Sequence, residues 1–227
     1  MLKAILFDLD GTLTDTDPLH FKLWKEILQS YGIEIDHPFY KANISGGQNP
    51  EIIKNLIPQL SVEEGVELAD DKEARFRESA EELQPLAGLM EMLDWIEATG
   101  LRKAVITNAP RENAKFMLET LHLTPRFEFV VLGEEMTAGK PDPAPYKYGL
   151  EKMQIQPSEA IVFEDSPSGI RSAVGAGIYT IGVATTHEPN ILKAVGASMI
   201  IKNFNDVQMW AKVKSLLETE KTVQVTE

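Results

Sequence analysis

Residues 4–12 read Ala4-Ile5-Leu6-Phe7-Asp8-Leu9-Asp10-Gly11-Thr12. The first four are apolar, and a short apolar run of this kind is typical of a buried strand in a parallel sheet. Two carboxylates one residue apart follow, and strand alternation predicts that both side chains point the same way. Because ligands bind beyond the carboxyl ends of strands in open parallel sheets, the stretch predicts an acidic ligand site there. An ordinary Asp-Gly turn after the strand is the alternative.

Short apolar runs of the same type recur along the chain and alternate with helical patterns. Strands are predicted over 103–107, 129–132, 160–163, 179–183 and, from a weaker run, 198–201. Helical periodicity is found over 86–99, 113–121 and 168–176. Strands that alternate with helices predict an α/β fold, a doubly wound parallel sheet with a Rossmann-like core.

Residues 16–83 contain no strand pattern and read as helical throughout. Helices are predicted over 19–31, 38–42, 50–57 and 62–83. Asp17 and Pro18 suit the N-cap and first turn of the first of these helices. We therefore predict a helical-bundle cap domain over 16–83, inserted after the first strand of an α/β core formed by 1–15 and 84–227. Two connections between them would make a hinge and lid. The polar tail after about Leu217 is expected to fray.

The composition is that of a globular protein with an acidic surface. The chain has 227 residues, of which 43% are hydrophobic, and its formal net charge is −13. This charge argues against nucleic acid or an anionic membrane as partner, since Lys and Arg would be needed to bind their phosphates. The chain has no Cys, which excludes disulfides, Cys-bound zinc and a thiol nucleophile. An anionic substrate would therefore need a local positive group, either a metal ion or a well-placed Lys.

The sequence also bears on where the protein works. No apolar run approaches the ~20 residues of a membrane span. The apolar run near the N-terminus is broken by Asp8 and does not have the form of a signal peptide. We expect a cytoplasmic protein that acts as a monomer.

Each further predicted strand is followed by a chemically useful group. After 103–107, the hydroxyl of Thr107 and the backbone N–H groups around Asn108 could hold phosphate oxygens, or either residue could cap the next helix. Lys140 lies beside Pro141, which would give it a stiff support, although a Lys in a turn is often simply solvated. After 160–163 come Glu164 and Asp165, two acids that suit Mg²⁺ because this cation prefers oxygen ligands.

The ordered set of groups is more specific than any one member. It resembles the haloacid dehalogenase-like hydrolase superfamily, whose four motifs match Asp8–Thr12, Thr107, Lys140 and Glu164-Asp165. The resemblance covers essentially the whole chain, and the helical insertion resembles the small cap of one subclass. Dehalogenases of this superfamily lack the second acid, so the presence of Asp10 implies phosphoryl transfer.

The resemblance implies a role for each acid. Asp8 would attack phosphorus and form an aspartyl-phosphate, and Asp10 would act as general acid and then as general base. Mg²⁺ would bind the Asp8 carboxylate, the main-chain carbonyl of Asp10 and Asp165, with Glu164 as a ligand or an outer partner.

The resemblance also implies how the phosphate is held. Thr107 and the backbone of Asn108 would bind phosphate oxygens, and Lys140 would offset the negative charge of Asp8 and the phosphoryl group.

The branch of the superfamily nearest to this sequence contains sugar-phosphate phosphatases and β-phosphoglucomutase. The first motif, together with His20 and Lys72, resembles the mutase. The mutase, however, uses a cap-loop arginine to grip a second phosphate, and this chain has Asn49 there, which cannot make a charged bidentate contact. We therefore expect a phosphatase for small sugar phosphates, with the mutase as the alternative. A non-catalytic sugar-phosphate sensor is a third hypothesis, against which the intact acids argue.

Four residues of the predicted cap are expected to contact the substrate: His20, Gly46, Gly47 and Lys72. Each has a structural alternative. His20 could simply face the hinge, Lys72 could be a solvated helix lysine, and the two glycines could be a loop between helices.

Overall fold

A computed structural model describes residues 1–79 and 83–218. Its centre is a six-stranded parallel sheet in the order β3-β2-β1-β4-β5-β6. The strands are β1 (Ala4–Phe7), β2 (Arg102–Thr107), β3 (Val130–Leu132), β4 (Ala160–Glu164), β5 (Tyr179–Val183) and β6 (Met199–Ile201). The predicted α/β fold with a doubly wound parallel sheet is confirmed, and every predicted strand is present within about a residue of its expected bounds.

The first strand lies in the middle of the sheet, between β2 and β4. Phe7 is level with Phe163 of β4, and the N–H of Asp8 donates to the carbonyl of Phe163 at 3.0 Å. Strand order runs outward in both directions from β1, so the gap between β1 and β4 is the switch point at which ligands bind in such sheets. The residues that follow β1 and β4 therefore share one edge.

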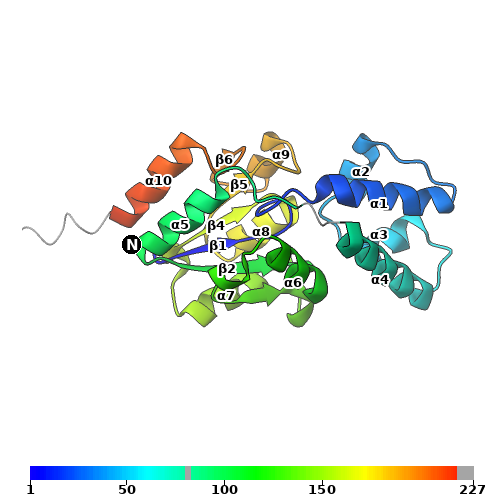
Figure 1. Cartoon of the computed structure of the whole chain (residues 1–227), viewed down its shortest axis with the longest axis horizontal. Helices are drawn as coiled ribbons and strands as arrows, with labels where there is room; N and C mark the ends of the chain where they lie inside the picture. Colours follow the sequence, from blue (N-terminus) through cyan, green and yellow to red (C-terminus); the bar gives the residue numbers. More distant parts are fainter. Residues whose placement is uncertain (80–82, 219–227) are drawn as a thin grey trace, which may run out of the picture. The chain divides into compact units, whose positions relative to one another are not determined.

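Alternate residues of the central strands face two different apolar layers. Leu6, Ile106 and Val162 pack with α7 (Ala144–Met153) and α8 (Pro167–Gly175). On the other face, Phe7 stacks on Phe163 with ring centroids 5.4 Å apart. Figure 1 shows α5 and α7 on opposite sides of the sheet. Burial on both faces explains why these strands read as continuous apolar runs rather than as alternating ones.

The remaining helices of this part of the chain are α5 (Leu89–Thr99), α6 (Arg111–Thr120), α9 (Pro189–Ala194) and α10 (Val207–Glu218), with short 3₁₀ turns at Thr124–Arg126, Gly133–Glu135 and Pro157–Glu159. The helices α7, α9 and α10 lie outside the segments that the sequence predicts as helical. In α7, Pro143 is the N-cap and Pro145 lies in the first turn, where a helix tolerates proline.

The chain divides into two compact units, one formed by Met1–Asp15 and the chain from Gln84 onward, the other by Thr16–Leu83. The second unit contains α1 (Asp17–Ser30), α2 (His37–Asn43), α3 (Asn49–Leu56) and α4 (Val62–Ser79). It has its own apolar core, made by Trp24, Ile27, Leu28, Ile35, Tyr40, Ile44, Ile52, Ile53 and Ile57. Within its described residues, the segment that the sequence predicts to be a helical insertion contains these four helices and no strand.

Two details of the helical unit differ from expectation. The N-cap of α1 is Thr16 rather than Asp17, because the Asp17 carboxylate instead accepts hydrogen bonds from Tyr40 and Ser45 at 3.1 and 2.9 Å. The last helix is described only to Ser79, and Leu83 is not helical. Residues 80–82 and the predicted fraying tail, 219–227, lie outside the described residues. In the described part of the chain no helix is both long and apolar enough to cross a membrane.

The two ends of the insertion leave the first unit side by side. Thr14 forms a bridge with Pro85, and its hydroxyl donates to the carbonyl of Gln84 at 2.8 Å. The N–H of Leu86 donates to the carbonyl of Leu13 at 2.9 Å. These contacts fix the segment that follows Asp8 and Asp10 against the chain that returns to the sheet.

Candidate active site

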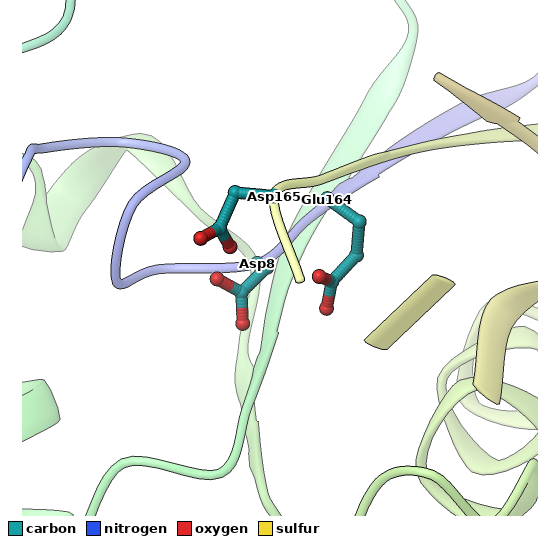
Figure 2. A group of neighbouring side chains, drawn as sticks. All are labelled: Asp8, Glu164 and Asp165. Atoms are coloured by element: carbon teal, nitrogen blue, oxygen red, sulfur yellow. The ribbon is translucent and has the colours of Figure 1, made fainter. Parts of the chain in front are cut away.

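Three carboxylates meet at the edge of the sheet beyond β1 and β4. Oxygens of Asp8, Glu164 and Asp165 lie within 4.8 Å of one another, and all three side chains are buried. Figure 2 shows the carboxylates of Asp8 and Asp165 turned toward each other. The register of β1 with β4 produces this convergence, because Asp8 directly follows the Phe7–Phe163 pair.

A single ammonium group bridges two of these acids. Lys140 Nζ donates to Asp8 Oδ1 at 2.6 Å and to Glu164 Oε1 at 2.5 Å. Burial would lower the pKa of Lys140, but the charges of Asp8 and Glu164 outweigh this effect and raise it, so the lysine stays charged. Lys140 therefore lies beside the first acid, and the alternative of a solvated lysine is wrong because Lys140 is only 5% exposed.

The backbone of Lys140 is held by the side chain of Asn108. The amide of Asn108 donates to the carbonyl of Lys140 and accepts from its N–H, both at 3.0 Å. A Cβ at Gly133 would overlap Asn108 Oδ1, so the glycine leaves room for this amide. The turn after β2 and the Lys140 loop therefore form one rigid support for the ammonium group.

Glu164 is fully buried and engaged on both oxygens. Oε1 accepts from Lys140 and from the Tyr146 hydroxyl at 3.1 Å, and Oε2 accepts from the N–H and hydroxyl of Ser166, each at 3.2 Å. The carboxylate lies against the first turn of α8, where a Cβ at Gly169 would overlap it. Glu164 is therefore a fixed counter-charge for Lys140.

Burial and crowding shift the acids toward their neutral forms. Burial raises the pKa of Asp8 from 3.8 to about 7, and the charges of Glu164 and Asp10 add to the rise while Lys140 opposes it. Burial, Asp8 and Glu164 likewise raise the pKa of Asp165 well above its ordinary value. The site therefore has an excess of negative charge that a cation would relieve.

The donor set fits a divalent metal ion. Three carboxylates face one ammonium group, and all the available ligand atoms of the acidic group are oxygens. Oxygen ligands are the type that Mg²⁺ prefers. The Asp10 carboxylate is not part of the group, which leaves its main-chain carbonyl as the expected ligand.

The turn after β2 contradicts the alternative that Thr107 or Asn108 caps the next helix. Neither Thr107 nor Asn108 caps the next helix, because the N-cap of α6 is Pro110. Instead the buried Thr107 hydroxyl accepts from the N–H of Ala109 at 2.9 Å, which closes a tight turn. The register pairs Val105 of β2 with Phe7 of β1, so the ends of the two strands, with Thr107 and the first acidic motif, lie at the same edge of the sheet.

The four predicted cap residues all lie in the helical unit. Lys72 is buried, and its Nζ lies 3.0 Å from His20 Nδ1 and 2.7 Å from Glu73 Oε1. The same Glu73 oxygen accepts from Asn49 Nδ2 at 2.5 Å. The alternative that Lys72 is solvated is therefore wrong. The glycines Gly46 and Gly47 lie between α2 and α3, where Gly46 has a φ of 74°.

A sequence profile of the haloacid dehalogenase-like hydrolases matches residues 5–183. The chain belongs to this family. Phosphorylated carbohydrates phosphatase of Thermotoga maritima is 32% identical over 206 residues, which cover 88% of this chain and 94% of that protein. Validoxylamine A 7'-phosphate phosphatase of Streptomyces hygroscopicus subsp. limoneus is 29% identical, covering 92% and 97%. A solved structure of a family IA, variant 3 hydrolase from Entamoeba histolytica is 27% identical, with a TM-score of 0.85 over 96% of this chain and 100% of that one.

Sequence reasoning missed several residues that shape the site of this haloacid dehalogenase-like hydrolase. Tyr146 contacts Glu164, and its ring lies 5.2 Å from Lys140 Nζ. Thr186 donates to Asp165 from the loop after β5. Tyr146 lies in a helix that the sequence did not predict, and Thr186 follows a strand whose end carries no acid. Only the rule that all strand ends share one edge could have directed attention to Thr186.

Substitution of Asp8 tests the electrostatics of the metal-free site. The folded-state pKa lies above 3.8, so folded protein keeps a proton that the unfolded chain loses, and stability falls as pH rises from about 4 to 7. In metal-free protein, Asp8→Asn should raise Tm at pH 8 by at least about 3 °C, as expected for about 1 kcal/mol in a chain of this size. The gain should shrink at pH 5.

Differential scanning calorimetry with a chelator present at both pH values makes this measurement. Asp71→Asn, on the exposed face of α4, is the matched control and should leave Tm unchanged at either pH. Equal Tm values for wild type and Asp8→Asn at pH 8 would contradict the charge imbalance.

A pair of glycine substitutions tests how closely α8 packs on Glu164. Both Gly169 and Gly65 lie in helices, where alanine normally stabilises by about 0.5–1 kcal/mol. A Cβ at Gly65 meets only Ile53 at 3.4 Å, so Gly65→Ala should raise Tm. Gly169→Ala should lower Tm, by the equivalent of about 1–3 kcal/mol, because it displaces a buried carboxylate. Thermal unfolding that moves both variants in the same direction would refute this packing.

Proposed function

We propose that this haloacid dehalogenase-like hydrolase is a Mg²⁺-dependent phosphatase that hydrolyses small phosphorylated sugars through an aspartyl-phosphate. The observation that carries the proposal is the Lys140 ammonium fixed between Asp8 and Glu164, with Asp165 beside Asp8. This arrangement presents a carboxylate nucleophile beside a fixed ammonium group, which suits a phosphoryl group. The named relatives that act on phosphorylated carbohydrates support the substrate class.

The chemistry assigned to Asp8 and Asp10 has two displacements. In the first, an oxygen of Asp8 attacks phosphorus, the bond from phosphorus to the sugar oxygen breaks, and Asp10 donates its proton to that oxygen. In the second, water attacks phosphorus, Asp10 takes a proton from the water, and the bond to Asp8 breaks. Free sugar and inorganic phosphate leave, and both acids return to their starting state.

Other residues would hold the reacting groups in place. Thr107 and the main chain of Asn108 bind phosphate oxygens, and Lys140 offsets the charge of Asp8 and the phosphoryl group. Mg²⁺, held by Asp8, the Asp10 carbonyl and Asp165, would supply charge neutralisation that lets an anionic substrate approach an anionic nucleophile.

Glu164 serves here as an outer partner of the metal site, because its oxygens already accept hydrogen bonds from Lys140, Tyr146 and Ser166.

In this proposal the helical unit is a cap whose His20, Gly46, Gly47 and Lys72 contact the sugar. The two connections of the helical unit leave the core unit at neighbouring positions, Asp15 and Gln84. Two adjacent connections of this kind are suited to a hinge. The Asp17 carboxylate further ties the start of α1 to Ser45, next to the two glycines. The hinge and the loop between α2 and α3 are thus parts of one hydrogen-bonded structure.

Contacts within the helical unit favour hydrolysis over the mutase reaction. A mutase must hold a second phosphate, yet Asn49 donates to Glu73 and carries no charge. Burial opposes ionisation of Glu73, but the charge of Lys72 and the hydrogen bonds that Glu73 accepts from Lys72 and Asn49 lower the pKa of Glu73. Its carboxylate therefore stays charged and neutralises Lys72. This pair offers hydrogen-bonding groups to a polyol but no uncompensated positive charge to a second phosphate.

The test of the proposed function is release of inorganic phosphate from a panel of sugar phosphates, assayed with Mg²⁺ and with EDTA. Phosphate release from several sugar phosphates should require the metal, and Asp8→Asn should reduce kcat by at least about 10³-fold because the nucleophile is lost. Conversion of β-glucose 1-phosphate to glucose 6-phosphate without phosphate release would instead establish the mutase. Absence of both activities, with sugar-phosphate binding retained by Asp8→Asn, would favour the sensor.

A further inference from the structure

The loop that follows β5 reaches the acidic site although its sequence carries no acid there. Glu164 of β4 is level with Gly182 of β5, so the residues after Val183 pass beside Asp165. Thr186 lies in this loop and is 9% exposed. Its hydroxyl contacts the Asp165 carboxylate at Oδ2 and lies 3.2 Å from the main-chain carbonyl of the same residue.

The hydroxyl of Thr186 has one proton to donate and several neighbours that could receive it. A carboxylate oxygen is a stronger acceptor than a carbonyl, and the contact to Oδ2 is the shorter one. His187 Nδ1 lies 2.9 Å from the same hydroxyl. With its proton given to Asp165, Thr186 has only lone pairs to offer its other neighbours.

The other oxygen of Asp165 is held in the same way. Thr12 Oγ1 donates to Asp165 Oδ1 at 3.4 Å, so each carboxylate oxygen has a hydroxyl donor. A carboxylate oxygen has two lone pairs. Because each Asp165 oxygen accepts one of these hydrogen bonds, one lone pair on each oxygen stays available for a cation. The two threonines lie far apart in the sequence, one after β1 and the other after β5. Together they limit rotation of the Asp165 carboxylate.

Packing around Gly11 holds Thr186 in this position. Gly11 has a φ of 76°, and a Cβ there would overlap the Asp165 carboxylate and lie 2.8 Å from the Thr186 methyl group. The loop after Asp10 therefore packs directly on both side chains.

We propose that Thr186 is a positioning residue for the divalent cation, which orients the Asp165 carboxylate without itself contacting metal or substrate. The inference rests on the proposed function, since it requires a cation at Asp8 and Asp165. Outer partners of metal ligands commonly contribute about 10–100-fold to metal affinity or activity. We therefore expect the contribution of Thr186 to be seen first in metal binding.

The chain provides a matched control in the residue next to it. Thr185 has a buried hydroxyl oxygen without a hydrogen-bond partner among the described residues. Thr186→Val and Thr185→Val make the same chemical change one position apart, and valine keeps the shape of threonine. Thr186→Ser restores the hydroxyl and removes only the methyl group that faces Gly11.

The experiment measures Mg²⁺ binding to the full chain by isothermal titration calorimetry, together with the rise in Tm on addition of Mg²⁺. Thr186→Val should raise the Kd for Mg²⁺ about tenfold and reduce the Mg²⁺-induced rise in Tm. Thr185→Val and Thr186→Ser should keep Kd within about threefold of wild type. In phosphate release, Thr186→Val should need more Mg²⁺ for half-maximal rate while kcat at saturating Mg²⁺ stays close to wild type.

The outcomes separate this inference from the proposed function. If wild type neither binds Mg²⁺ nor releases phosphate, the proposed function fails and the inference fails with it. If wild type does both and Thr186→Val binds Mg²⁺ as tightly as Thr185→Val, only the inference is overturned. Failure of Thr186→Ser to restore binding would also overturn it, because the methyl group and not the hydroxyl would then be responsible.

Discussion

The arrangement of this molecule depends on one ammonium group placed between two buried carboxylates. Lys140 joins the residues that end β1 and β4, the two neighbouring strands between which the strand order of the sheet reverses. Without it, Asp8 and Glu164 would be two buried charges of the same sign in contact range, an arrangement that costs several kcal/mol per ion even after relaxation. The surrounding structure serves this contact: Asn108 fixes the lysine backbone, Tyr146 and Ser166 fix Glu164, and Gly169 leaves the carboxylate room.

The ammonium group offsets only part of the negative charge, and the remainder gives the site its chemical character. Burial with a deficit of positive charge raises the pKa of Asp8 to about 7, which stores unfavourable energy in the metal-free state. A cation and the positive groups around a phosphate would release that energy on binding. The proposed function thus depends on an excess of negative charge that remains in the folded, metal-free protein. Such a loss of stability in favour of activity is common.

Much of this organisation could be predicted from local sequence. The strand of Ala4–Phe7 is apolar on both faces, so its end and the acids after it were apparent, and the shared edge of a parallel sheet implied that Asp8, Lys140 and Asp165 would meet. Contacts decided by tertiary packing were not predictable. The Asn108 side chain turned out to bind the Lys140 main chain, and Asp17 turned out to bind Tyr40 rather than cap its own helix. In both cases a polar side chain has several local partners of similar strength, and only the fold decides among them.

The pairing of Thr14 with Pro85 has a consequence for how such a protein can change over evolutionary time. The seventy or so residues between them begin and end at neighbouring backbone positions, and neither end interrupts a strand. A segment attached in this way can be lengthened, shortened or replaced with little effect on the sheet, because the closure entropy of an inserted loop grows only slowly with its length. The acidic edge of the sheet and the inserted helices can therefore diverge at different rates, so that, under the proposed function, a lineage can acquire new substrates by exchanging one module while its reaction chemistry stays unchanged.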